Sequence, residues 1–159
     1  MTDHLTLAVT VEAPAERVFA AMTDWVAQGR WMVGTRVRVV DPPGHEVGAR
    51  LEAFTGVGPM GFLDTMTVTQ WDPPRAVEVR HTGRVVQGTG LFEVVALGPQ
   101  QSRFVWSEQL VIPLGALGRA GWRVVRPVFG RGVMRSLRTF AALVEAGELG
   151  GGEIGAAGA

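Results

Sequence analysis

The stretch Leu5–Met22, which reads LTLAVTVEAPAERVFAAM, decides the fold because its hydrophobic period changes half-way along. In its first half, leucine and valine alternate with threonine, alanine and glutamate, which is the pattern of a strand with one buried face. After Pro14 the apolar residues Val18, Phe19 and Met22 recur at helical spacing, and proline is favoured at the start of a helix. The sequence therefore predicts a strand that runs directly into a short helix.

Downstream of this junction, strand patterns alternate with turn residues. A second short helix is expected at Asp24–Trp31, with Asp24 as its N-cap. Six further strands are expected at Thr35–Val40, Val47–Phe54, Phe62–Trp71, Ala76–Thr82, Val85–Leu97 and Arg103–Ile112. Together with the first strand this gives about seven strands, and such a series is typical of a meandering antiparallel sheet.

One long helix is expected near the end of the chain. Between Pro127 and Ala146 the apolar residues are spaced by three or four positions, which places them on one face of an amphipathic helix. The preceding segment Leu114–Trp122 is rich in glycine and is expected to be a loop with a short helix. Residues 1–147 are predicted to form one domain, and residues 148–159 a glycine-rich, disordered tail.

The composition excludes several kinds of chemistry. The 159 residues include no cysteine, tyrosine or lysine, so thiolate, phenol and Schiff-base chemistry are excluded, and all fifteen basic residues are arginine. The formal net charge is zero, which gives no general attraction to nucleic acid or to anionic membranes. The three histidines, His4, His45 and His81, do not have the spacing of metal ligands, so we expect neither a metal nor a cofactor.

The sequence also bears on location and partners. The N-terminus MTDHLTL has no signal-peptide pattern, and no apolar run approaches the roughly 20 residues that cross a bilayer, so a cytoplasmic protein without stable membrane insertion is expected. We interpret the six arginines from Arg119 to Arg138 as a solvated helix face, with contact to a membrane surface as the alternative. Nucleic-acid binding is not expected, and the sequence leaves open whether the chain forms a homodimer.

Three motifs, taken in order, resemble the START-like superfamily and in particular its polyketide cyclase/dehydrase branch. They are Val11–Phe19 (VEAPAERVF), Trp71–Arg75 (WDPPR) and Arg103–Glu108 (RFVWSE). The resemblance implies an α+β helix-grip fold, in which a strongly bent antiparallel sheet wraps the C-terminal helix and leaves an apolar cavity between them. The branch includes lipid carriers, hormone receptors and ring cyclases, so the fold does not fix the function.

Strand alternation assigns the side chains that face this cavity. On the last strand Phe104, Trp106, Glu108 and Leu110 share one face, which we take as the concave face. Gly88 and Gly90 share a face of their strand with Phe92, and these glycines are expected either to let the strand bend or to leave space above the sheet. The expected ligand-binding residues are Trp31, Phe62, Met66, Val79, His81, Phe92, Phe104, Trp106, Glu108, Leu110, Phe129 and Val133.

Three polar residues fall within these apolar sets: Asp64, His81 and Glu108. A buried carboxylate is costly unless it is hydrogen-bonded or paired, or has a raised pKa. One interpretation is structural, with His81 paired to one of the two acids. The other is functional, with the three residues serving as a polar anchor for a ligand or as a general acid and base.

These observations support three hypotheses about function. The first is binding of a small hydrophobic molecule, such as a lipid, isoprenoid or polyketide, in the cavity. The second is an enzyme of the polyketide cyclase, aromatase or dehydratase type, in which His81 acts with Asp64 or Glu108. The third is an interaction module whose interior is filled by side chains. The glycine-rich segment Gly56–Gly61 is interpreted as a hairpin loop, or a gate to the cavity.

Overall fold

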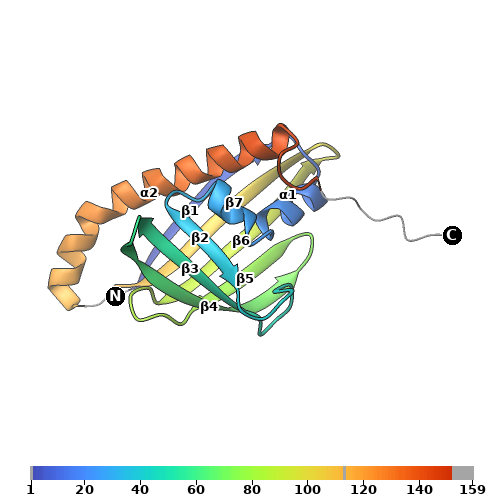
Figure 1. Cartoon of the computed structure of the whole chain (residues 1–159). Helices are drawn as coiled ribbons and strands as arrows, with labels where there is room; N and C mark the ends of the chain where they lie inside the picture. Colours follow the sequence, from blue (N-terminus) through green and yellow to red (C-terminus); the bar gives the residue numbers. More distant parts are fainter. Residues whose placement is uncertain (1, 113, 152–159) are drawn as a thin grey trace.

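A computed structural model describes residues 2–112 and 114–151. Its seven strands are β1 (Thr2–Val11), β2 (Thr35–Val39), β3 (Arg50–Val57), β4 (Met60–Asp72), β5 (Ala76–His81), β6 (Gly88–Gly98) and β7 (Gln101–Val111). They form one antiparallel sheet in the order β1-β7-β6-β5-β4-β3-β2 (Figure 1). The helices are α1 (Ala15–Met22), the short 3-10 helix η1 (Ala27–Arg30) and α2 (Gly115–Glu145).

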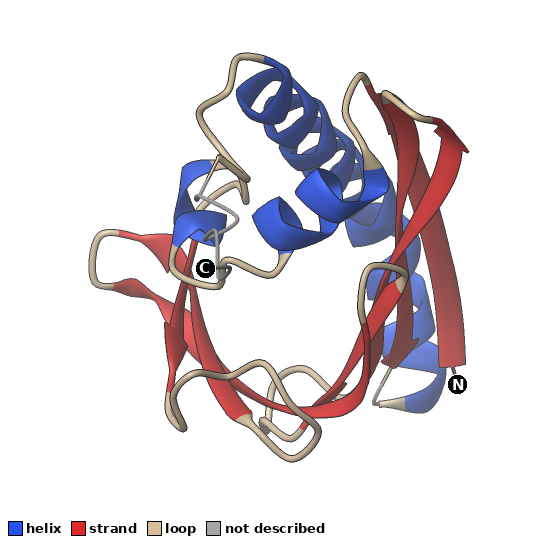
Figure 2. Ribbon diagram, turned by 90° about the vertical axis from the view of Figure 1, so that its right-hand side faces the viewer, coloured by secondary structure: helices blue, strands red, loops and turns tan. Residues whose placement is uncertain are grey.

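The sheet curves into a trough, and the helices lie at its open side (Figure 2). This is the α+β helix-grip arrangement expected from the sequence, with a bent antiparallel sheet and a long C-terminal helix. Strand β1 pairs with β7 rather than with its neighbour in sequence, and this pairing runs from Thr2 opposite Val111 to Val11 opposite Ser102. The first strand and the last strand of the chain therefore lie side by side.

The junction between β1 and α1 forms as its hydrophobic periods predict. Along β1 exposed residues alternate with buried or half-buried ones, and Val11 at its end is completely buried. Helix α1 then follows Pro14 and buries Val18, Phe19 and Met22 against the sheet. Asp24 Oδ1 accepts a hydrogen bond from the Ala27 amide at 3.1 Å, which holds the start of η1.

The start of α2 differs from the expectation. The helix begins at Gly115 and contains Pro127, so the loop expected at Leu114–Trp122 is wrong. Trp122 Nε1 and Arg126 Nε each donate a hydrogen bond of 2.8 Å to Oδ2 of Asp3 in β1. These contacts hold a glycine-rich segment in a helix that its own propensity disfavours.

Several strand boundaries also differ from the expected ones. β3 begins at Arg50 rather than Val47, and β6 begins at Gly88 rather than Val85. The segment Gly56–Gly61 is mostly strand, because Gly56 and Gly61 pair across the β3–β4 hairpin. A Cβ atom added to Gly56 would lie 2.2 Å from the Met60 carbonyl oxygen, so this close approach of two backbones requires glycine.

The packed core lies under the C-terminal half of α2. The rings of Phe140 and Phe104 are 4.8 Å apart, and Phe140 and Trp31 are 5.0 Å apart. Leu149, which follows the helix, is also buried, and Glu148 forms an ion pair with Arg30 at 2.6 Å. Residues 148 and 149 of the expected tail therefore contact the domain, while residues 152–159 of that tail lie outside the described part.

Candidate functional site

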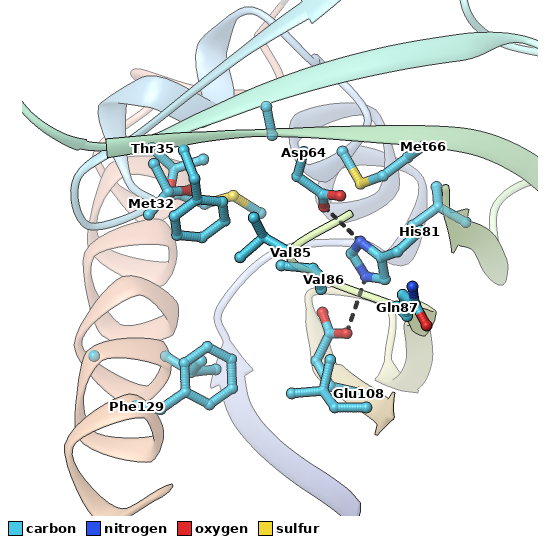
Figure 3. A pocket seen from close by; sticks show the side chains of 18 of the residues that line it. Met32, Thr35, Asp64, Met66, His81, Val85, Val86, Gln87, Glu108 and Phe129 are labelled. Carbon is cyan, nitrogen blue, oxygen red and sulfur yellow. Dashed lines mark hydrogen bonds and ion pairs between the residues drawn. The ribbon is translucent and has the colours of Figure 1, made fainter. Parts of the chain in front are cut away.

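A cavity of about 660 Å³ lies between the concave face of the sheet and the N-terminal half of α2. Its walls are mainly aliphatic and aromatic. The structure brings together ten of the residues that the sequence assigned to ligand binding: Phe62, Met66, Val79, His81, Phe92, Trp106, Glu108, Leu110, Phe129 and Val133. Asp64, the remaining acid/base candidate, also lines the cavity (Figure 3).

Two residues expected in the lining are not part of it. Trp31 and Phe104 are 2% and 0% exposed, and both pack against Phe140 of α2 in the closed core. Alternation identifies the concave face correctly, but it does not say how closely the helix packs on each part of that face. The C-terminal half of α2 covers Phe104, whereas Trp106, two residues further along β7, reaches the cavity.

Much of the helix side of the cavity was missed by the sequence analysis. Trp122 and Val125 line it from the N-terminal half of α2, and Val85 and Val86 line it from the loop between β5 and β6. The two α2 residues were missed because their segment was expected to begin as a loop. A helical spacing does connect Trp122, Val125 and Phe129, and it could have revealed the longer helix despite Pro127.

The polar part of the cavity is a cluster in which His81 lies between two acids (Figure 3). His81 Nδ1 is 2.6 Å from Asp64 Oδ2, and His81 Nε2 is 3.3 Å from Glu108 Oε2. Trp106 Nε1 donates a further hydrogen bond of 2.7 Å to Glu108 Oε1. The three side chains of the cluster are at least nine-tenths buried. The histidine therefore pairs with both acids, where the structural interpretation expected one.

Glycines in β6 allow His81 on β5 to reach Glu108 on β7. Gly88 lies opposite His81, and Gly90 lies opposite Glu108, so no side chain separates the two. A Cβ atom at Gly90 would lie 3.1 Å from Glu108 Oε1, which makes Gly90 the glycine that leaves space for the carboxylate. At Gly88, φ is +133°, a backbone conformation that residues with a side chain rarely adopt. Glycine is therefore needed at this position for the backbone conformation rather than for space.

The carboxylates determine the charge of the histidine. Burial alone would lower the pKa of His81, but the hydrogen bonds and the charges of Asp64 and Glu108 outweigh it and raise the pKa to about 9. At neutral pH the ring is therefore an imidazolium that donates both N–H groups to carboxylates. In this state His81 can release a proton but cannot accept one, and a ligand can replace Glu108 more easily than Asp64 because the Glu108 contact is longer.

Within residues 2–112 and 114–151, no group of histidine and carboxylate side chains has an arrangement that could hold a metal ion. Among the helices of the same residues, none combines the length and the apolar composition needed to span a membrane.

Comparison with known families identifies the chain. The family described as "Polyketide cyclase / dehydrase and lipid transport" matches residues 2–145. The chain belongs to this family. The resemblance stated above on three short motifs is thereby confirmed. A comparison with curated proteins finds no match.

Several proteins of known structure share the fold with the chain. The Zhui aromatase/cyclase from Streptomyces sp. R1128 has a TM-score of 0.77 at 17% identity, over 97% of this chain and 100% of that one. TTHA0849 from Thermus thermophilus has a TM-score of 0.76 at 15% identity, over 91% and 98% of the two chains. The di-domain ARO/CYC BexL from the BE-7585A biosynthetic pathway has a TM-score of 0.70 at 14% identity, over 91% and 47%. At these identities the likeness concerns the fold alone.

Proposed function

We propose that the protein binds a small hydrophobic molecule, such as a lipid, isoprenoid or polyketide, inside the cavity. The observation that carries this proposal is a hollow of about 660 Å³ whose walls are apolar apart from a few grouped polar side chains. Pockets for small ligands commonly measure roughly 300–1,000 Å³ and have the same kind of lining. The third hypothesis, an interior filled by side chains, does not agree with this hollow.

Binding can be measured from the protein's own fluorescence, because Trp25, Trp106 and Trp122 line the cavity. We expect the neutral probe 1-decanol to change tryptophan emission in a saturable way, and native mass spectrometry to detect a one-to-one complex. A panel of neutral aliphatic and aromatic probes that produced neither signal would contradict the proposal.

A variant that fills the cavity provides the matching test. Gly132 lines the cavity from α2, and a Cβ built on it has no neighbour within 4 Å beyond the adjoining residues of the helix, so the first side-chain carbon of Gly132→Phe fits and we expect its ring to occupy part of the cavity. We expect this variant to bind 1-decanol at least about tenfold more weakly, a loss of ~1.4 kcal/mol. The control is Val128→Phe, at an exposed position of the same helix, which should retain wild-type affinity.

Catalysis of the cyclase, aromatase or dehydratase type is the second candidate. The His81 cluster favours it, and an aromatase/cyclase is among the proteins that share the fold. A ligand carbonyl or hydroxyl that displaced Glu108 from Nε2 would receive a proton from the imidazolium, and the freed Glu108 carboxylate would be the base. If Glu108→Gln turned over a β-hydroxy ketone substrate as fast as the wild type, this assignment would be wrong.

A further inference from the structure

The charged residues that line the cavity are few and unevenly balanced. Among the described residues of the lining, only Asp64, His81 and Glu108 carry ionisable groups. The fifteen basic residues of the chain are all arginine, and not one of these arginines lines the cavity. Two carboxylates that share one imidazolium leave the cavity with a single net negative charge.

This net charge lies in surroundings that do little to offset it. Glu108 receives one additional hydrogen bond, from Trp106, which is neutral. Asp64 Oδ1 is buried and has no hydrogen-bond partner among the residues that the structure describes. An uncompensated charge surrounded by apolar side chains is unfavourable, and its attraction for an opposite charge is stronger there than in water. The group that completes the cluster is therefore expected to come with the ligand.

We propose that the ligand of this cavity is an apolar amine, whose cationic nitrogen binds beside the Asp64–His81–Glu108 cluster. This inference rests on the proposed function, because it requires that the cavity takes up a small hydrophobic molecule. Glu108 is the residue that the ammonium group contacts, since its bond to His81 is the longer of the two. The hydrocarbon part of the ligand then lies toward Phe129 and the N-terminal half of α2 (Figure 3).

The same balance disfavours the opposite ligand chemistry. A fatty acid or another organic anion would bring a second negative charge to a cavity that contains no arginine. The only cation in the described lining, His81, already donates both of its N–H groups to carboxylates. A carboxylate ligand would therefore find no free donor of positive charge, and like charges in an apolar site repel strongly.

Three probes of equal chain length test the inference: decylamine, 1-decanol and decanoate, each titrated at pH 7 by tryptophan fluorescence. We expect decylamine to bind at least about tenfold more tightly than decanoate, with 1-decanol between them. Equal binding of decylamine and decanoate, or tighter binding of decanoate or 1-decanol, would overturn the inference while the proposed function stands. If none of the three bound, the proposed function would fail and this inference with it.

Variants then locate the selectivity in the cluster. Glu108→Gln leaves one carboxylate opposite the imidazolium, so the ratio of decylamine to 1-decanol affinity should fall at least about tenfold. The matched control is Glu46→Gln, which removes the same charge from an exposed position outside the cavity and should keep the wild-type ratio. Asp64→Asn serves as the second variant if circular dichroism shows that Glu108→Gln is unfolded. An unchanged ratio in a folded cluster variant would overturn the inference.

Discussion

At the scale of single residues, the pair of carboxylates around His81 makes the stability of the fold depend on pH. The pKa of His81 is about 9 in the folded protein, against an ordinary value of 6.5. A raised pKa means that the folded state holds the proton more tightly than the unfolded state does. The resulting stabilisation is fully present below about pH 6.5 and is lost as the pH rises through about 9.

This linkage can be measured by urea unfolding between pH 6 and pH 10. We expect the wild type to lose about 3 kcal/mol more than His81→Gln over this range, as the difference between the two pKa values implies. Subtracting the variant removes the pH effects that the two proteins share. Parallel pH profiles of the two proteins would contradict the ion-paired histidine.

The sequence predicted these three residues as site candidates, but it did not predict how they are arranged. Alternation placed Asp64, His81 and Glu108 on the concave face, because side-chain direction follows from strand period alone. It left open which acid the histidine meets. That depends on the register that sets Gly88 and Gly90 between β5 and β7, which a single sequence does not reveal.

At the scale of elements, the two halves of α2 have different tasks. The C-terminal half packs Leu137, Phe140 and Val144 into the closed core, where each is completely buried. The N-terminal half covers the hollow and leaves Val124 and Val128 mostly exposed. Helical periodicity predicted the C-terminal half because its apolar face is continuous. The glycines and Pro127 obscured the N-terminal half, whose helix depends on contacts with β1.

The hydrogen bonds of Asp3 should therefore control the mobility of the N-terminal half of α2. We expect Asp3→Asn to weaken the bonds to Trp122 and Arg126 and to accelerate amide hydrogen exchange in residues 115–126 several-fold, while residues 133–145 exchange as in the wild type. Asp41→Asn is the control, because it removes an equally ion-paired carboxylate that contacts Arg50 instead. If residues 115–126 exchanged no faster in Asp3→Asn than in Asp41→Asn, Asp3 would not be the residue that holds this segment.

At the scale of the whole molecule, one end of the domain is solid and the other is hollow. Phe140 and Phe129 lie on the same helix, Phe140 in the closed core and Phe129 in the cavity wall. The order of strands and helices indicated a fold built around a cavity, and the resemblance to the START-like superfamily implied the bent sheet that wraps one long helix. The position of the border between core and cavity was not predictable, as Trp31 and Phe104 show, since it depends on how closely α2 approaches each strand.

The same truncation should have different consequences at the two ends of the domain. Phe140→Ala leaves a void in a packed region and is expected to lower the free energy of unfolding by about 3–5 kcal/mol. Phe129→Ala enlarges an existing hollow, so we expect a loss of about 1 kcal/mol or less and a clear change in 1-decanol affinity. Chemical denaturation combined with ligand titration checks both, and equal destabilisation would argue against the hollow.

The pairing of β1 with β7 also constrains how the chain can fold during translation. Thr2–Val11 leaves the ribosome well before the strand that provides its hydrogen bonds, which ends at Val111. Until β7 has been synthesised, β1 lacks the strand with which it pairs, and an unpaired strand can associate with other chains. A topology with such distant partners folds slowly, because the loop between them must close first. Strand β1 can therefore complete its hydrogen bonds within the sheet only after β7 has been synthesised.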